Sequence, residues 1–254
     1  MSKSELDVYE ATQQILNTLS RITQDRAGGL FPHGVTLIDL EVSVGDAAKV
    51  HVKVEGPATA AREQMFRDTF AALARLALPD LQTDDGTVAR MLLAETLTPA
   101  SSSYDAAQAQ TSMNAMKSAV VHRLTKPSDF GAAGATNHRD IICAPGQFAG
   151  FSKNTSGEVV VDAAIEANID DIVNRANTGA PGVYYAHLKM AIDTADSTVT
   201  DPFSAITSVG GVATLGGTWG WRKAGTAAPG GKLVAIPTAS GGVILRNQFY
   251  TLKV

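Results

Sequence analysis

The stretch TVARMLLAETLTP, residues 87–99, decides how the centre of this chain is expected to fold. Leu92 and Met91 lie three and four residues before Glu95, so the three share one face of an α-helix. This face is apolar and is expected to pack inward. A carboxylate that is partly removed from water resists ionisation, so its pKa rises toward the value that a general acid needs. The alternative is that Glu95 is a solvated residue at a helix end, since Pro99 follows closely.

The composition is that of a globular protein with one large or two small domains. The chain has 254 residues, of which 44% are apolar and 18% are charged. A net charge of −4, with scattered lysines and arginines, argues against a nucleic-acid partner. The single cysteine, Cys143, excludes an intrachain disulfide and argues against a thiolate zinc site. The histidines lack metal-ligand spacing, and we expect no metal or cofactor.

The N-terminal residues do not have the pattern of a signal peptide. Residues 1–22 carry acidic side chains early and contain no apolar run. No stretch of the chain approaches the ~20 apolar residues that a membrane span needs. We therefore expect a protein that is made in the cytoplasm without a signal peptide and has no membrane span.

Residues 1–80 are expected to form an N-terminal α/β module with a helix–β-hairpin–helix order. Apolar residues recur at three- and four-residue steps in the two helical segments, and apolar and polar residues alternate in the hairpin between them. The segments are a helix at 5–24, a hairpin of 35–44 with 48–56, and a helix at about 58–77.

Residues 81–254 are expected to form a second, mainly helical domain. Residues 78–86 form a connector in which Asp84 or Asp85 is expected to cap the helix that carries Glu95. The last fifty residues are rich in glycine and threonine and are typical of loops with short strands. Further helices are expected at about 105–125, 162–177 and 181–195. The predicted fold class is therefore α+β.

Three motifs of the second domain occur in an order that resembles a known family. They are ARMLLAETLTP at 89–99, AVVHRLTKP at 119–127 and IICAPGQFAGF at 141–151, followed by RNQFY at 246–250. Together they resemble the SleB-type cell-wall hydrolases, which are spore-cortex-lytic and related peptidoglycan-cleaving enzymes. The matching residues are Glu95, Val121, Arg123, Leu124, Pro145, Gly146, Gln147, Phe148, Asn247, Phe249 and Tyr250.

This sequence also departs from the family pattern. The second glutamate of the family's first motif has no counterpart. His122 replaces an asparagine, and Gln248 replaces a histidine. Residues 127–140 form a long insertion.

The resemblance implies a lysozyme-like domain in which Glu95 is the catalytic acid. Glu95 would protonate the glycosidic oxygen between N-acetylmuramic acid and N-acetylglucosamine. A lytic transglycosylase needs only this glutamate and releases a 1,6-anhydro product, which makes it the first choice of activity. A muramidase-type hydrolase, the second choice, pairs two carboxylates. Candidates for the second carboxylate are Asp105, Asp129, Asp140 and Asp162, and nothing in the sequence singles one out.

Several residues are candidates for binding the sugar, each with a structural alternative. Gln147 can hydrogen-bond a sugar or satisfy the backbone of a tight turn. Phe148 can form an apolar wall or belong to the core, and Tyr250 can contact Glu95 or substrate or fill the core. Aromatic rings suit the C–H faces of sugars, which also makes candidates of four further residues. These are Tyr184, Tyr185, Trp219 and Trp221, of which the tryptophans alternate along one expected strand.

Two functions of different class follow. The first is a peptidoglycan-cleaving enzyme that acts in the periplasm or cell wall of a target cell, as a delivered antibacterial effector or a phage lysin. Residues 1–80 would then serve delivery or partner binding through a secretion machine or a phage component. A toxin also implies an immunity protein in the producing cell. The second is a non-catalytic structural or binding component of a phage or secretion apparatus on a lysozyme-like body.

Overall fold

A computed structural model describes most of the chain, which divides into two compact units. The described residues are 36–42, 50–55, 75–178, 182–226 and 231–254. The first unit comprises residues 1–76 and 173–186, and the second comprises residues 77–172 and 187–254. The sequence suggested a boundary at residue 80 and gave no sign that residues 173–186 group with the N-terminal part.

A β-hairpin forms the described part of the N-terminal region. Strand β1 (Thr36–Val42) pairs antiparallel with β2 (Val50–Glu55), which confirms the predicted hairpin. The helices predicted at 5–24 and 58–77 lie outside the described residues, except for residues 75–77, which are not helical.

Helices α6 (Ala163–Asn177) and α7 (Gly182–Asp196) confirm the two helices that the sequence predicted in this region. The last turn of α6 belongs to the first unit. There the side-chain carbonyl of Asn177 accepts the Leu76 N–H, and its amide donates to the Leu76 carbonyl, both at 2.8 Å. These two bonds join stretches that are a hundred residues apart in the sequence.

Helix α3 (Asp84–Glu95) opens the second unit and carries the central glutamate. Its N-cap is Thr83, whose side-chain oxygen accepts the Gly86 N–H at 3.0 Å. The prediction that Asp84 or Asp85 caps this helix is therefore wrong. Both aspartates lie in the first turn, where a negative charge suits the positive end of the helix dipole.

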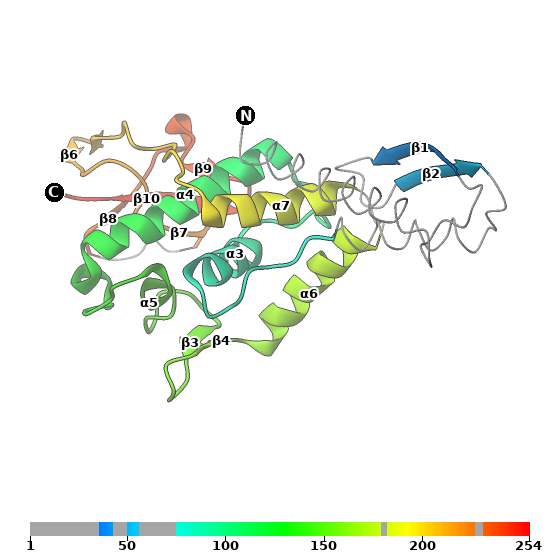
Figure 1. Cartoon of the computed structure of the whole chain (residues 1–254). Helices are drawn as coiled ribbons and strands as arrows, with labels where there is room; N and C mark the ends of the chain where they lie inside the picture. The colour runs from blue at the N-terminus through cyan, green and yellow to red at the C-terminus, as the bar shows by residue number, and fades with distance from the viewer. Residues whose placement is uncertain (1–35, 43–49, 56–74, 179–181, 227–230) are drawn as a thin grey trace. The chain divides into compact units, whose positions relative to one another are not determined.

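Helix α4 (Ala106–Thr125) begins at its N-cap Asp105 and confirms the prediction for 105–125. It packs against α3 and the short helix α5 (His138–Ile142), as Figure 1 shows. Lys117 of α4 is buried, and its ammonium group donates to the Ala195 carbonyl near the end of α7 at 2.7 Å. Fully buried apolar side chains of α3, α4 and α5 form the core between them: Val88, Met91, Leu92, Met113, Met116, Val120, Ile141 and Ile142.

The C-terminal part is built of short antiparallel strands, which confirms the predicted loops with short strands. Its central strand is β10 (Asn247–Leu252), which pairs with three others. These are β7 (Gly220–Lys223), β8 (Leu233–Ala235) and β9 (Val243–Ile244). Two separate hairpins are β3 (Phe151–Lys153) with β4 (Val159–Val161), and β5 (Ser208–Val209) with β6 (Val212–Ala213). Short 3-10 helices lie at Pro127–Phe130 and Thr238–Ser240.

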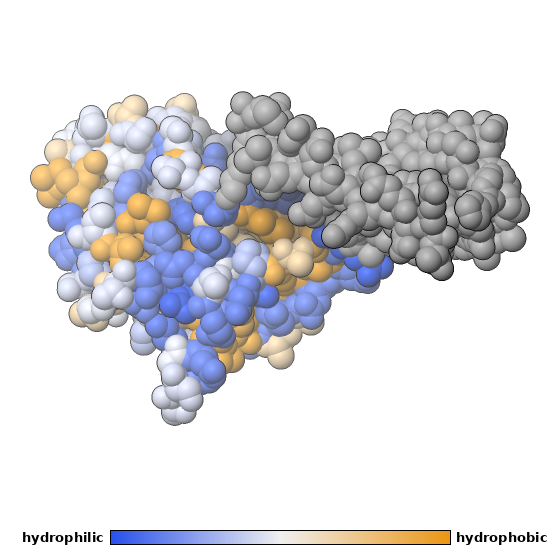
Figure 2. Space-filling view, in the orientation of Figure 1, coloured by the Kyte–Doolittle hydropathy of each residue, from blue (hydrophilic) through white to orange (hydrophobic). Residues whose placement is uncertain are grey.

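The described elements are therefore a mixed α+β set of helices and small antiparallel sheets. Figure 2 shows a largely hydrophilic surface over α5 and an apolar area near β6. Exposed Val212 and Leu215 contribute large apolar side chains in and just after β6. Within the described ranges, no helix combines the length and the apolarity that crossing a bilayer requires.

Candidate functional site

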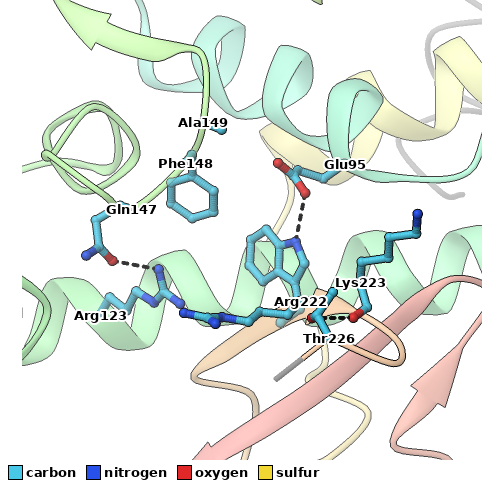
Figure 3. A pocket seen from close by; sticks show the side chains of 9 residues that line it. Glu95, Arg123, Gln147, Phe148, Ala149, Arg222, Lys223 and Thr226 are labelled. Atoms are coloured by element: carbon cyan, nitrogen blue, oxygen red, sulfur yellow. Dashed lines mark hydrogen bonds between the residues drawn. The ribbon is translucent and has the colours of Figure 1, made fainter. Parts of the chain in front are cut away.

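Glu95 lies in a pocket of about 370 Å³ in the second unit. The pocket is lined by Glu95, Arg123, Gln147, Phe148, Ala149, Trp221, Arg222, Lys223 and Thr226. These residues come from the end of α3, from α4, from the loop after α5, and from β7 and the turn that follows it. Figure 3 shows Glu95 on one side and Arg123 and Gln147 on the other, with the Phe148 ring between them.

The end of α3 is held in place from two sides. On the inner side, buried Met91 and Leu92 anchor the last turns of the helix in the core. On the outer side, the Glu95 carbonyl, which the helix leaves without an intrahelical donor, accepts the Asn247 side-chain amide at 3.1 Å. Arg246 also donates to this carbonyl at 3.4 Å. Strand β10 and the turn before it therefore hold the backbone of Glu95 in place.

The side chain of Glu95 is partly buried and meets an indole. The Trp221 Nε1–H donates to Glu95 Oε2 at 3.2 Å. The same indole packs on the Phe148 ring, with the two centroids 5.1 Å apart and the planes tilted by 41°. One carboxylate oxygen is thus oriented by a fixed donor, while the group still borders the pocket.

Arg123 forms the opposite part of the lining and is 7% exposed. Its Nε donates to the Trp219 carbonyl and one terminal nitrogen donates to Gln147 Oε1, both at 2.8 Å. Aromatic rings surround the guanidinium carbon at 4.9 Å for Phe130, 5.4 Å for Phe148 and 5.9 Å for Trp221. Such rings attract a cation through their negative faces.

Burial lowers the pKa of Arg123 to about 10, because the charged form loses its hydration. This value is still far above neutral pH, so the group remains cationic. Among the residues that the structure describes, no carboxylate forms an ion pair with it. The described groups that contact its charge are neutral oxygens and aromatic faces.

A tight turn presents Gln147 and Phe148 to the pocket. Gly146 adopts a φ of 76°, which glycine reaches without strain, and the Gln147 N–H donates to the Ala144 carbonyl at 3.1 Å. The turn follows Cys143, which ends α5 and is 9% exposed. Burial raises the pKa of this thiol to about 11, which favours the protonated form at neutral pH.

The structure brings Gln147 and Phe148 together with Glu95, as the sequence suggested, but it places three other candidates elsewhere. Trp219 is buried, stacks on His122 with centroids 5.1 Å apart, and donates its indole N–H to the Gly216 carbonyl at 2.9 Å. Tyr250 is 2% exposed in the middle of β10. Tyr184 belongs to the first unit, where Arg175 lies 5.3 Å over its ring. Substrate contacts by these three, as by Gln147 and Phe148, stay a prediction.

The four carboxylates that the sequence offered as partners of Glu95 have other contacts and do not line the pocket. Asp105 caps α4, and Asp162 accepts the Ala164 N–H. Asp129 pairs with Lys232 at 2.7 Å, and Asp140 pairs with Lys153. Among the lining residues that the structure describes, Glu95 is the only acid.

Besides Ala149 and Thr226, three lining residues were not expected from the sequence or were given less weight there. Trp221 was only a general stacking candidate, and Arg222 and Lys223 were not considered. All three lie on β7, which pairs with β10 and so reaches the end of α3. The segment TWGWRK at 218–223 signals a strand with aromatic and basic side chains, but its neighbour depends on contacts more than a hundred residues away.

This arrangement suits acid–base chemistry by one oriented carboxylate. Next to the carboxylate lie a hydrogen-bonding amide, aromatic walls and three cationic side chains. When the chain is compared with known proteins, no family model, no curated protein and no solved structure matches it.

Proposed function

We propose that this protein cleaves the glycan strands of peptidoglycan with Glu95 as the general acid and base. One observation carries the proposal. The motifs that resemble the SleB-type enzymes lie far apart in the sequence, yet Glu95, Arg123, Gln147 and Phe148 line one pocket, and Asn247 holds the Glu95 carbonyl. Under this proposal the second unit is a lysozyme-like body.

The reaction begins with the carboxyl group of Glu95 in its protonated form. It donates its proton to the oxygen of the bond between N-acetylmuramic acid and N-acetylglucosamine, and the bond breaks with development of positive charge on the muramic ring. The carboxylate then takes the proton of the muramic 6-hydroxyl, whose oxygen attacks the anomeric carbon. The product is a 1,6-anhydro end, and Glu95 regains its proton.

A lytic transglycosylase is favoured over a hydrolase because of the number of carboxylates in the described lining of the pocket. An inverting or retaining hydrolase holds a second carboxylate roughly 5–9.5 Å from the first. Among the described residues that line the pocket, Glu95 has no such companion. Trp221 instead supplies a donor that orients one oxygen of Glu95, so the other is left to reach the glycosidic oxygen.

The substrate suggests where the protein acts. Peptidoglycan lies in the periplasm or cell wall, so we propose an antibacterial effector or a phage lysin that is delivered to a target cell. A producing cell would then need an immunity protein, and the N-terminal region would contact a secretion machine or a phage component.

The proposal is tested by digesting purified sacculi with the wild type and with Glu95→Gln, and reading the products by mass spectrometry. We expect the variant to lose activity about 10²–10⁴-fold, since Gln keeps the shape of the side chain but carries no transferable proton. Glu158→Gln, at an exposed glutamate of the β3–β4 turn, is the matched control and should digest like the wild type. Circular dichroism establishes that both variants are folded.

The products decide between the alternatives. Anhydro-muropeptides from the wild type establish a lytic transglycosylase. Reducing muropeptides establish a hydrolase and require a second carboxylate. Intact sacculi from folded wild-type protein contradict the proposal and favour the non-catalytic structural or binding component.

A further inference from the structure

The described lining of the pocket around Glu95 contains more cationic than acidic side chains. Among the described residues that form this lining are one carboxylate, that of Glu95, and three cationic side chains, those of Arg123, Arg222 and Lys223. An uncharged sugar would need hydrogen-bond partners and an apolar wall, but no such surplus of cations. The charge therefore indicates something about the ligand beyond the bond that is cleaved.

Arg123 is the decisive residue because its charge is buried. A cation at 7% exposure loses most of its hydration, and this cost is normally repaid by an acid. The two protein acceptors that it contacts, the Trp219 carbonyl and Gln147 Oε1, are both neutral. Within the described part of the chain no acid pairs with it, so the guanidinium still lacks a counter-ion while it borders an open pocket.

The guanidinium is also held rigidly. Gln147 fixes one terminal nitrogen, and β7 passes so close that a Cβ on Gly220 would lie 2.7 Å from the other. A planar donor fixed in this way is suited to a carboxylate, which accepts two parallel N–H bonds from arginine. Because little side-chain freedom remains to be lost, the anion would bind at a small entropic cost.

The Trp221 indole also sets the spacing between Arg123 and Glu95. Both contact the Trp221 indole, Glu95 through its N–H and Arg123 with its guanidinium carbon 5.9 Å from the ring centroid. A ligand with its reacting bond at Glu95 would therefore place a neighbouring substituent near Arg123. The ring that carries that substituent would lie along the wall formed by Trp221 and Phe148.

We infer that the pocket binds its glycan through a carboxylate carried by, or attached to, the muramic acid residue, and that this carboxylate pairs with Arg123. Muramic acid offers two sources of such a group: the lactyl carboxylate when no peptide is attached, and the carboxylates of the stem peptide when one is. Lys223, which is exposed in the same lining, adds to the attraction of either anion. This inference rests on the proposed cleavage of peptidoglycan and deepens it by naming the charged group of the substrate that the site recognises.

The test uses the full-length protein and four soluble substrates. Two are peptide-free glycan strands, one with free lactyl carboxylates and one with these groups converted to methyl amides. Two are peptide-bearing strands, one with free stem-peptide carboxylates and one with these amidated. The measured quantity is kcat/KM for each, at low and at high salt.

We expect the free acid to be cleaved about tenfold or more faster than its amide in at least one pair, since an ionic hydrogen bond is worth about one order of magnitude or more. A difference in the peptide-free pair identifies the lactyl carboxylate, and a difference in the peptide-bearing pair alone identifies the stem peptide. The preference should shrink at high salt. Equal rates within both pairs overturn the inference while leaving glycan cleavage intact.

A variant locates the preference on Arg123. Arg123→Gln removes the charge, so the ratio of the rates on acid and amide should fall toward one. A ratio that stays unchanged contradicts the assignment. If this variant fails to fold, Lys223→Gln on the exposed part of the lining should lower the same ratio about two- to threefold. A ratio that Lys223→Gln leaves unchanged then counts against the inference.

Loss of the proposed function itself would look different. In that case none of the four substrates is cleaved. Titration calorimetry then measures whether the wild type binds the acid more tightly than the amide, in the peptide-free pair and in the peptide-bearing pair. Tighter binding of an acid than of its amide supports a carboxylate site without cleavage. Equal or undetectable binding of both overturns the inference.

Discussion

At the scale of single residues, the contact between Glu95 and Trp221 sets the geometry of the pocket. The indole N–H holds Oε2 at 3.2 Å, and the ring is held in turn by Phe148. A carboxyl group that is oriented before substrate binds needs less rearrangement during the reaction. Trp221 is therefore a positioning residue for Glu95.

Trp221→Phe tests this role because it removes the N–H and keeps an aromatic ring against Phe148. We expect kcat on peptidoglycan strands to fall about tenfold, the magnitude of one hydrogen bond to a charged group, while KM changes little. Steady-state rates on soluble peptide-free strands provide the measurement.

Trp219→Phe is the matched control, since it also removes one indole N–H, but from the Gly216 carbonyl in the core. It should lower the free energy of unfolding by about 1–2 kcal/mol and affect kcat less than Trp221→Phe does. Equal losses of kcat in the two variants would contradict a specific role of Trp221. A rise in KM for Trp219→Phe would instead return Trp219 to the binding site.

At the scale of the elements, α3 depends on a close approach at its first turn. A Cβ on Gly86 would lie 1.9 Å from the backbone oxygen of Asp80, much closer than van der Waals contact allows. The connector folds back onto the helix at this point, and Thr83 both caps Gly86 and donates to the Asp80 carbonyl at 2.7 Å. A glycine is needed here for space.

Gly86→Ala should therefore destabilise the protein, although alanine is the better helix former by about 1 kcal/mol. We expect a loss of about 1–3 kcal/mol in the free energy of unfolding, because the added methyl group must push the connector away. Urea denaturation followed by circular dichroism measures this change.

The reverse substitution on an open helix surface provides the reference. Ala167→Gly, at an exposed position of α6, should cost about 1 kcal/mol through helix propensity alone. If Gly86→Ala stabilises the protein by a similar amount, the close approach to Asp80 does not constrain the helix.

The sequence predicts these elements to different degrees. The sequence placed α4, α6 and α7 to within a residue or two. For α4 the apolar periodicity gave the bounds but not the burial, since the structure buries all of residues 115–120 and not one face alone. The cap of α3 was assigned to the wrong residue because Thr83, Asp84 and Asp85 can all cap a helix. For the last fifty residues the sequence predicts short strands but not the bounds of each strand, since strands of two to six residues carry little periodicity.

At the scale of the whole molecule, the site could be predicted only in part. Glu95, Gln147 and Phe148 were named because they stand in recognisable motifs. Trp221 and the cations of β7 join them through the pairing of β7 with β10, which is a long-range contact that no local pattern specifies. The sequence also gave no sign that Arg123 would be buried without an acid among the described residues.

Global stability should depend on pH through His187, which is fully buried and near the Tyr104 hydroxyl at 3.1 Å. Burial lowers its pKa to about 4. The unfolded chain binds a proton below about pH 6.5, but the folded protein does not until about pH 4. The free energy of unfolding should therefore fall by about 3 kcal/mol as the pH drops through this window.

His187→Gln removes this titration and leaves the other acidic and basic groups unchanged. The measurement is urea denaturation of both proteins at half-unit steps from pH 7.5 to pH 4. The variant should lose less stability on acidification than the wild type, and parallel curves would contradict the assignment. His138, whose pKa is also lowered by burial, contributes to both curves alike.

Cys143 gives this protein a practical advantage for spectroscopy. The chain has one thiol, and at neutral pH that thiol is protonated and shielded at the end of α5. A cysteine introduced at an exposed position, such as Thr155 in the β3–β4 turn, would be the one that reacts readily with a maleimide dye. Site-selective fluorescent labelling is thus open to this protein with its native cysteine left in place.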